Sequence, residues 1–108
     1  MIKREVLHIG LCKARHDIMT NDGEEVTDFF FEKIENPHDY LHIERTAWDK
    51  IVSDVIPNFD TVYIYVTGLT MALTSVLKMF RLNWDDFQTI QLMHYDRETN
   101  TYKAQLWK

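Results

Sequence analysis

The pattern of hydrophobic and polar positions alternates along the chain between strand-like and helix-like segments. Glu5 to Cys12 mixes β-branched and aliphatic residues with few charges, which is typical of a strand buried on both faces. Thr61 to Val66 is β-branched or aromatic throughout and predicts a second buried strand. Thr89 to Asp96 and Thr101 to Trp107 predict two more strands, joined by a hairpin loop at Arg97 to Asn100.

Two segments have the signals of helices. Asn36-Pro37 predicts a helix start, since Asn is a favoured N-cap and Pro suits the first turn. Pro57-Asn58 ends this helix, whose hydrophobic residues recur at a spacing of four: Ile43, Ala47, Ile51 and Val55, with Trp48 and Val52 beside them. Thr67-Gly68 ends the preceding strand, and Leu69 to Phe80 then predicts a second amphipathic helix, with Leu69, Leu73, Val76, Leu77 and Phe80 on one face.

The segment between the first strand and the first helix is less regular. Asn21-Asp22-Gly23 is a turn signal. Glu25 to Ile34, which contains three consecutive Phe residues, is interpreted as a strand although its alternation is poor. The predicted element order is therefore ββαβαββ, within a single domain spanning residues 1–108. Helices between buried strands predict an α/β fold: a small Rossmann-like, mostly parallel sheet with two main helices and a C-terminal β-hairpin.

Composition narrows the classes of function. The chain has 108 residues, of which 45% are hydrophobic and 27% charged, as in a soluble globular domain. Cys12 is the only cysteine, and no segment has the length of a signal peptide or membrane span, so we expect a cytoplasmic protein without membrane contact. The net charge of −5 disfavours binding of duplex nucleic acid. His38 and His42 share a helix face but lack further ligands, so neither a metal nor a cofactor is predicted.

Candidate chemistry gathers where the predicted parallel strands end. Ligands of such sheets bind beyond the carboxyl ends of the strands. Gly68 permits a sharp turn, and the first N–H groups of the following helix have no intrahelical partners. These features predict an anion site, to which the neighbouring strand ends add further donors. The candidate ligand-binding residues are Lys13, Arg15, His16, Thr67, Gly68, Leu69, Thr70 and His94.

Other interpretations of the same residues stay open. Thr67 or Thr70 can serve purely as a cap for the helix. Cys12 lies near Lys13 and His16, whose positive charge favours a thiolate, but the interpretation as a plain buried cysteine at a strand end is preferred.

The Lys13 to His16 segment and the Val66-Thr67-Gly68-Leu69-Thr70 joint resemble the small Rossmann-like nucleotide-sensing domains of prokaryotic and phage defence. These are the CARF-type domains of CRISPR accessory proteins and the related ring nucleases. The resemblance implies a cyclic-oligonucleotide or other nucleotide ligand at the joint, a homodimer, and, if there is catalysis, a ring-nuclease-like phosphodiesterase. The matching residues cover under a tenth of the chain. The strands from Thr89 to Trp107 and the acidic Glu24 to Glu35 segment have no counterpart in that pattern.

Two functional hypotheses follow. The first is a binding domain for a nucleotide or similar phosphate-bearing anion, more a binder than an enzyme because no paired base and nucleophile is evident. The alternative is a phage-type, anti-CRISPR-like inhibitor that contacts a protein partner through acidic and aromatic surface. Its acidic candidates are Glu24, Glu25, Asp28, Glu32, Glu35, Asp85 and Asp86, and aromatic residues beyond the needs of the core are Tyr63, Tyr65, Trp84, Tyr95, Tyr102 and Trp107.

Overall fold

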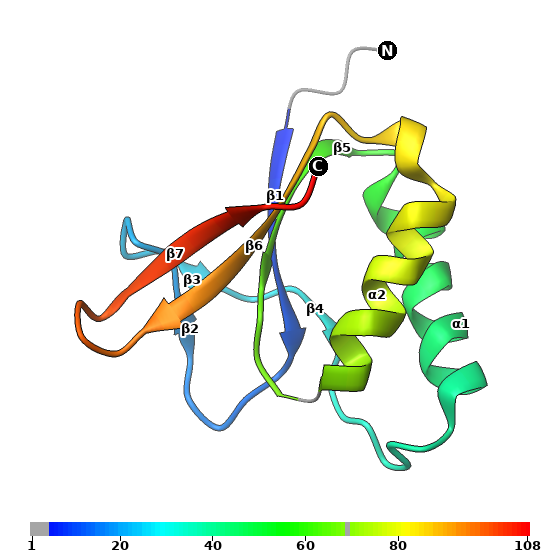
Figure 1. The fold of residues 1–108 in the computed structure, drawn as a ribbon, viewed down its shortest axis with the longest axis horizontal. Helices are drawn as coiled ribbons and strands as arrows, with labels where there is room; N and C mark the ends of the chain where they lie inside the picture. Colours follow the sequence, from blue (N-terminus) through cyan, green and yellow to red (C-terminus); the bar gives the residue numbers. More distant parts are fainter. Residues whose placement is uncertain (1–4, 69) are drawn as a thin grey trace.

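A five-stranded sheet forms the centre of the molecule. The computed structural model describes residues 5–68 and 70–108. The sheet has the order β4-β1-β5-β6-β7. The first four strands in this order run parallel, and β7 pairs antiparallel with β6 (Figure 1). The strands are β1 (Glu5–Cys12), β4 (Phe29–Phe31), β5 (Phe59–Tyr65), β6 (Thr89–Asp96) and β7 (Thr101–Leu106). The predicted α/β fold, a small Rossmann-like and mostly parallel sheet with a C-terminal hairpin, is thus confirmed.

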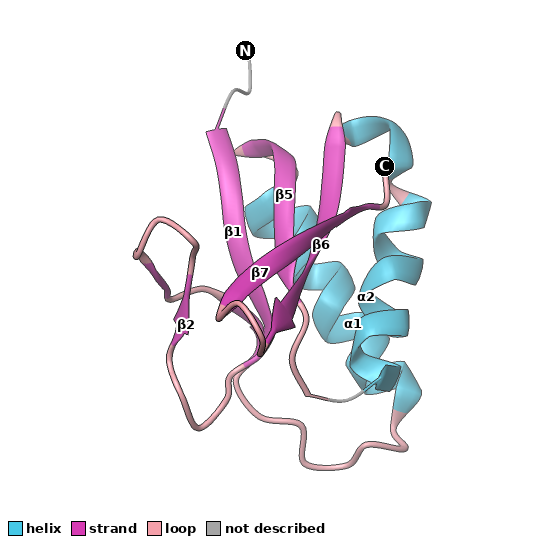
Figure 2. Ribbon diagram, turned by 60° about the vertical axis from the view of Figure 1, so that its left-hand side comes forward, coloured by secondary structure: helices cyan, strands magenta, loops and turns pink. Residues whose placement is uncertain are grey.

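Both long helices pack on the same face of the sheet. Figure 2 shows α1 (Tyr40–Lys50) and α2 (Thr70–Leu82) side by side on one side of the strands. Alternate strand residues such as Ile9, Val62 and Ile90 are fully buried beneath them. Phe80 of α2 lies at the centre of this layer, with its ring edge-to-face against Phe30 and Phe87 at centroid distances of 5.8 and 4.9 Å. No helix in the described part of the chain is long and apolar enough to cross a bilayer.

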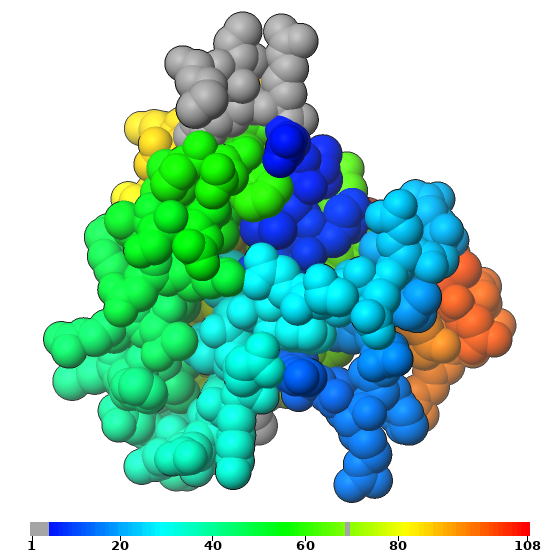
Figure 3. Space-filling view, turned by 180° about the vertical axis from the view of Figure 1, so that it is seen from behind, coloured from blue at the N-terminus to red at the C-terminus, as the bar shows by residue number. Residues whose placement is uncertain are grey.

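A small second sheet covers part of the helix-free face. Its strands, β2 (Ile18–Met19) and β3 (Glu25–Val26), are antiparallel. Ile18 and Val26 are buried against Tyr65 and Met93, which point away from the helices. From behind, the residues between β1 and α1 (blue to cyan) extend from the β6–β7 hairpin (orange) to α1 (green), as Figure 3 shows. This covering is partial, because Val6 near the start of β1 is 44% exposed. The prediction that β1 is buried on both faces was therefore wrong for its first half.

The predicted strand from Glu25 to Ile34 is in fact two short strands in different sheets. The chain breaks at Thr27-Asp28, where the Asp28 carbonyl accepts a hydrogen bond from the N–H of Gly10 at 2.8 Å. The Asp28 carboxylate forms an ion pair with Lys50 of α1 at 2.8 Å. Burial alone would lower the pKa of Lys50, but the hydrogen bonds that its ammonium donates to the Asp28 and Asp54 carboxylates, together with their negative charges, outweigh burial and raise that pKa. The polar Asp28 thus interrupts the strand because it bonds to two other elements.

Gly10 permits the close packing of β4 on β1. A Cβ atom at this position would lie 2.5 Å from the ring of Phe29, which is too close for any side chain.

The first helix begins three residues later than predicted. Asp39 is the N-cap, and its carboxylate accepts from the N–H of His42 at 3.2 Å. Asn36 instead accepts from the N–H of His38 in a turn before the helix. Beyond α1 the helix widens into a π-helical turn, Ile51–Val55. A strict spacing of four drifts around an α-helix, and the wider turn offsets this drift, so Val55 still faces the core.

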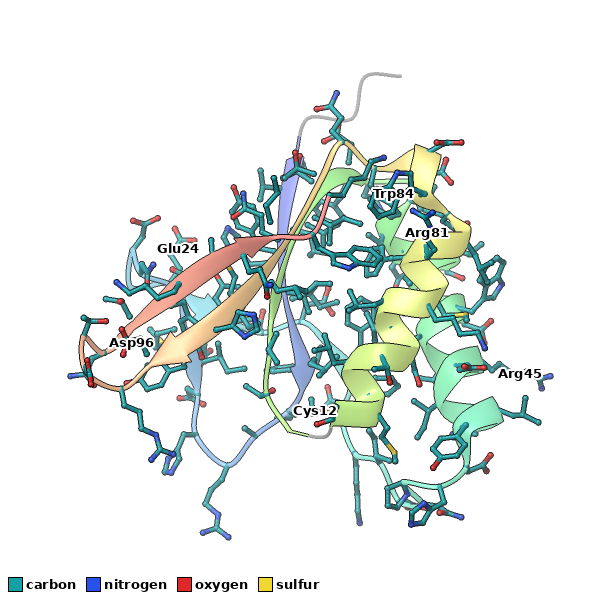
Figure 4. All side chains as sticks on the ribbon, viewed as in Figure 1. Cys12, Glu24, Arg45, Arg81, Trp84 and Asp96 are labelled. Carbon is teal, nitrogen blue, oxygen red and sulfur yellow. The ribbon has the colours of Figure 1, made fainter. Side chains whose placement is uncertain are left out.

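The last residues of the chain pack against the segment that connects α2 and β6. The rings of Trp84 and Trp107 pack edge-to-face with centroids 5.1 Å apart. The Lys108 ammonium lies over the Trp84 ring and donates to the carbonyls of Trp84 and Phe87. Trp84 belongs to a 3-10 turn, η2 (Trp84–Asp86), and Arg81 stacks on the same ring (Figure 4). These two tryptophans, considered above as interface residues, serve internal packing.

We predict that Phe80→Ala lowers the free energy of unfolding by about 3 to 5 kcal/mol, because it leaves a cavity between Phe30 and Phe87. Leu82→Ala, two residues along the same helix, is the matched control, since Leu82 is 65% exposed. Its effect should stay within about 0.5 kcal/mol. Urea unfolding monitored by circular dichroism measures both, and equal effects would contradict the assignment of Phe80 to the core.

Candidate functional site

The chain reverses direction across the sheet between β1 and β5. From β1 it passes to β4 at one edge, and through α1 it returns to β5 on the other side of β1. The carboxyl ends of β1 and β5 therefore mark the topological switch point, where sheets of this type bind ligands. Cys12 lies at this end of β1, next to the start of α2 (Figure 4).

The two strand ends are joined directly at the switch point. The Thr67 hydroxyl donates to the Cys12 carbonyl at 2.8 Å, and the Cys12 N–H approaches the same Oγ1 atom at 3.4 Å. Gly68 follows with a φ of 81°, a backbone conformation that favours glycine. A Cβ at Gly68 would lie 3.2 Å from the Cys12 Cβ and Sγ atoms. Thr67 and Gly68 therefore close the crevice between β1 and β5 by close packing.

A cavity of about 550 Å³ lies beside this junction, between the loop after β1 and the β6–β7 hairpin. We call it the hairpin cavity. Its polar and aromatic walls come from segments far apart in the sequence, which meet at the carboxyl ends of the strands. It is lined by Ala14, His16, Asp17, Ile18, Met19, Thr20, Asn21, Thr67, Tyr95, Asn100, Thr101 and Tyr102.

Hydrogen bonds and ring contacts hold the walls of the hairpin cavity together. The Asn21 amide donates to the Tyr102 carbonyl at 3.0 Å and accepts from the Tyr102 N–H at 2.8 Å. The Tyr95 hydroxyl donates to Asn100 Oδ1 at 3.0 Å, and the Tyr95 and Tyr102 rings meet edge-to-face at 5.3 Å. Because both walls are anchored to the sheet, the cavity is formed before any ligand arrives.

A smaller hollow of about 200 Å³ lies on the other side of the same loop. Lys13, His16 and Asp17 line it together with Glu25 of β3. Lys13 also forms an exposed ion pair with Glu32, with Nζ and Oε2 3.5 Å apart. Such an exposed pair is weak, so the Lys13 ammonium remains available to a stronger anion.

The structure brings together only part of the predicted site. His16 and Thr67 line the hairpin cavity, while Lys13 faces the smaller hollow next to it. Arg15 is exposed on the loop between these residues. Gly68 and Thr70 flank the switch point at the start of α2, and Leu69 lies outside the described residues.

His94 does not join the other candidates. Its Nε2 donates to Gln105 Oε1 of β7 at 2.8 Å. Successive residues of a strand point to opposite faces, and His94 shares its face with Leu92, which packs under the helices. Tyr95 has the opposite orientation and lines the hairpin cavity. The expectation that His94 points at the same site as Thr67 was wrong, because the neighbouring residue Tyr95 is the one whose side chain faces that site.

The sequence interpretation missed the contribution of the β6–β7 hairpin. Tyr95, Asn100 and Tyr102 form one wall of the cavity, whereas the sequence pattern of the hairpin predicts only an antiparallel edge of the sheet. The available signal was the pair of tyrosines on facing strands, since Tyr95 and Tyr102 are directly opposite in the register.

Tyr65 lies beneath the cavity wall and is 1% exposed. Burial raises its pKa from 10.0 to about 12, and the neighbouring Tyr102, Tyr63 and Asp22 act in the same direction. Its hydroxyl is hydrogen-bonded to His8 Nδ1 at 2.8 Å, and the Tyr102 ring packs edge-to-face on it at 4.8 Å. Tyr65 is thus a neutral support of the Tyr102 wall across the ordinary pH range.

Comparisons of this chain with protein families, with curated proteins and with solved structures found no match. Among residues 5–68 and 70–108, no three His, Cys, Asp or Glu side chains lie together as a metal site would require.

We predict that stability falls as the pH rises from about 10 to about 12, because Tyr65 must stay protonated in the folded state. The pKa of Tyr65 is higher in the folded than in the unfolded state. Its contribution to the free energy of unfolding is therefore fully present at pH values below the unfolded pKa, and it is lost as the pH rises through the folded pKa. Tyr65→Phe should flatten this dependence, whereas Tyr40→Phe, at a 52% exposed position, should not. Absorbance titration of the phenolate measures the shift directly, and a midpoint near 10 for Tyr65 would contradict it.

We predict that Thr67→Val lowers the free energy of unfolding by about 1 to 2 kcal/mol, because the Cys12 carbonyl loses its hydroxyl donor. Thr67→Ser, which keeps the hydroxyl, should retain most of the stability. Urea unfolding of the two variants tests this, and equal stabilities would show that the hydroxyl does not hold the strand ends together.

Proposed function

We propose that this protein binds a nucleotide or a similar phosphate-bearing ligand in the hairpin cavity. The single observation that carries the proposal is the position of this cavity at the carboxyl ends of β1, β5 and β6, with His16, Thr67 and Tyr95 on its walls. Its volume of about 550 Å³ falls within the range of small-molecule sites, roughly 300 to 1,000 Å³.

The aromatic wall of the hairpin cavity is suited to stacking against the planar base of a nucleotide. Tyr95 is half exposed, so part of its ring is accessible to a ligand. Stacking of a base on an aromatic side chain contributes about 1 to 3 kcal/mol. Asn100 and Thr101 on the same wall offer polar groups to the edge of such a base.

The opposite wall supports the phosphate. His16 lines the cavity, and Arg15 precedes it as an exposed residue of the same loop. Neither side chain forms an ion pair with another described residue. The helix α2 begins three residues after Thr67, and the N-terminus of a helix attracts anions. The Thr67 hydroxyl already donates to Cys12, so we assign Thr67 to positioning the turn and assign phosphate contact to Arg15 and His16.

We propose binding without turnover. Among the described lining residues, no hydrogen bond joins an acid or base to a nucleophile. A ring-nuclease-like phosphodiesterase activity would require such a pair or an equivalent positioning of the phosphate.

The alternative, an inhibitor with an acidic face, has weaker geometric support. Asp28 and Glu32 are paired with Lys50 and Lys13. Glu24 and Trp84, which precedes Asp85, lie at opposite sides of the molecule in Figure 4. These acidic residues are therefore not gathered in one patch.

We predict that a nucleotide raises the melting temperature of the protein. A ligand at ten times its Kd stabilises the folded state by about 1.4 kcal/mol. For a domain of this size that is roughly 5 to 10 °C. Thermal-shift measurements should compare adenosine, AMP, ATP and a cyclic oligoadenylate, and the adenosine arm separates recognition of the base from that of the phosphate. No shift with any of them at millimolar concentration would overturn the proposal.

Variants locate the ligand. Tyr95→Ala should weaken nucleotide binding by about fivefold to a hundredfold through loss of stacking, and Arg15→Ala should weaken AMP more than adenosine. Lys33→Ala is the matched control, because Lys33 is an exposed cation that does not belong to the His16 loop, and its loss changes the net charge as Arg15→Ala does. If Lys33→Ala weakens AMP binding as much as Arg15→Ala does, the effect is nonspecific electrostatics.

A further inference from the structure

The solvent side of α1 carries a stripe of hydrophobic side chains that the fold does not bury. Leu41 is 82% exposed, Trp48 38% and Val52 41%. These residues and Arg45 are spaced by four, three and four positions, which places them on one face of a helix. The buried face of the same helix is formed by other residues, namely Ile43, Ala47, Ile51 and Val55.

One positive and one negative side chain lie within or beside this hydrophobic stripe. Arg45 lies between Leu41 and Trp48 and points away from the rest of the molecule (Figure 4). Asp49 follows four residues later. Within the described residues, neither Arg45 nor Asp49 forms an ion pair, although Glu44 beside them is paired with Lys78 of α2 at 2.9 Å. The face thus combines three exposed hydrophobic side chains with one unpaired charge of each sign.

We infer that this face binds a second copy of the same chain, with the two α1 helices antiparallel about a two-fold axis. Two-fold contacts are self-complementary: if residue i meets residue j, then j meets i. Placing the axis midway between Arg45 and Trp48 brings Leu41 opposite Val52 of the second copy. Arg45 then lies opposite Trp48 of the second copy. Asp49 of the second copy follows that Trp48 by one residue and so lies near the same Arg45.

The chemistry of these pairs is complementary. An Arg guanidinium is attracted to the face of a Trp ring, and the contact strengthens as water is excluded. The neighbouring Asp49 carboxylate supplies the opposite charge to the same guanidinium. Both interactions occur twice in the dimer. This match of the stripe with itself is the reason for choosing a second copy over an unrelated helix, which would need the same charges in the same register.

The size of the contact sets the expected affinity. The 11 residues of α1 and the 5 of its π-helical continuation span about 24 Å. One helix pair of this length buries less than the roughly 800 Å² per partner of a standard interface. We therefore expect a weak dimer, with a Kd on the order of 10 to 100 μM.

The inference is independent of the proposed ligand site. The hairpin cavity is lined by the loop after β1 and by the β6–β7 hairpin. This hairpin lies on the far side of the sheet from α1 (Figure 1), so an α1 dimer leaves both cavities open. Failure of nucleotide binding would not affect the dimer, and a monomeric protein would still allow the ligand to bind.

Sedimentation velocity of the full chain between roughly 5 and 500 μM tests the inference. The wild type should shift from monomer to dimer across this range. Leu41→Glu should raise the Kd at least tenfold, because it places a carboxylate against hydrophobic surface. Arg45→Glu should do the same. Adding Asp49→Arg to Arg45→Glu should restore the part of the affinity that comes from the charge pair, but not the part from the contact between Arg45 and the Trp48 ring.

The matched control is Leu106→Glu, at a 67% exposed position on the opposite face of the sheet. It should leave the dimer unchanged. All four variants change exposed positions, so their circular dichroism spectra and unfolding midpoints should match the wild type. A wild type that stays monomeric at the highest concentration overturns the inference. So does a dimer that Leu106→Glu disrupts and Leu41→Glu does not, or one that the double variant Arg45→Glu/Asp49→Arg forms no more tightly than Arg45→Glu alone.

Discussion

A sheet with both of its helices on one face needs another cover for its second face. In this protein the residues between β1 and α1 provide that cover only in part, through the β2–β3 pair packed on Tyr65 and Met93. This cover leaves part of the second face of the sheet exposed, because two strands of two residues each supply little hydrophobic area. The hairpin cavity forms where this short cover ends and the β6–β7 hairpin projects past it.

The same constraint separates two kinds of strand residue. On the helix side, Ile9, Val62 and Ile90 are completely buried and contribute to stability through ordinary packing. On the other side, β1 begins with the exposed Val6 and continues with the half-buried His8, whose polar ring is hydrogen-bonded to Tyr65. A polar and aromatic surface of this kind tolerates water and ligands, so chemistry is expected on this side of the sheet.

The long elements were predictable because their patterns are strong. β1 and β6 have the predicted bounds, and the spacing of Ile43, Ala47, Ile51 and Val55 identified the buried face of α1. The exact start of α1 was harder to predict, because two residues able to cap a helix lie three positions apart. Asn36 has the character of an N-cap, yet it closes a preceding turn while Asp39 caps the helix.

The candidate site was harder to predict because it depends on contacts between distant segments. Thr67 and Gly68 identified the turn after β5. The polar residues at the end of β1 identified the segment that lies next to this turn at the switch point. No local pattern indicates that Asn21 will bond to the backbone of Tyr102, 81 positions away. That contact brings the loop after β1 against the hairpin and so creates the cavity. The choice between Tyr95 and His94 likewise depends on which face the sheet leaves uncovered.

Thr67 shows how one residue can satisfy two interpretations that the sequence left open. Its hydroxyl proton is committed to the Cys12 carbonyl, so it cannot also donate to a phosphate without breaking that bond. The bond fixes the relative position of the ends of β1 and β5, and with it the distance between the Arg15-His16 loop and the start of α2. A structural role for Thr67 is therefore compatible with a ligand site, because the geometry that would select a phosphate depends on this bond. The donors would be the neighbouring loop and the helix backbone, and Thr67 would act by keeping them in place.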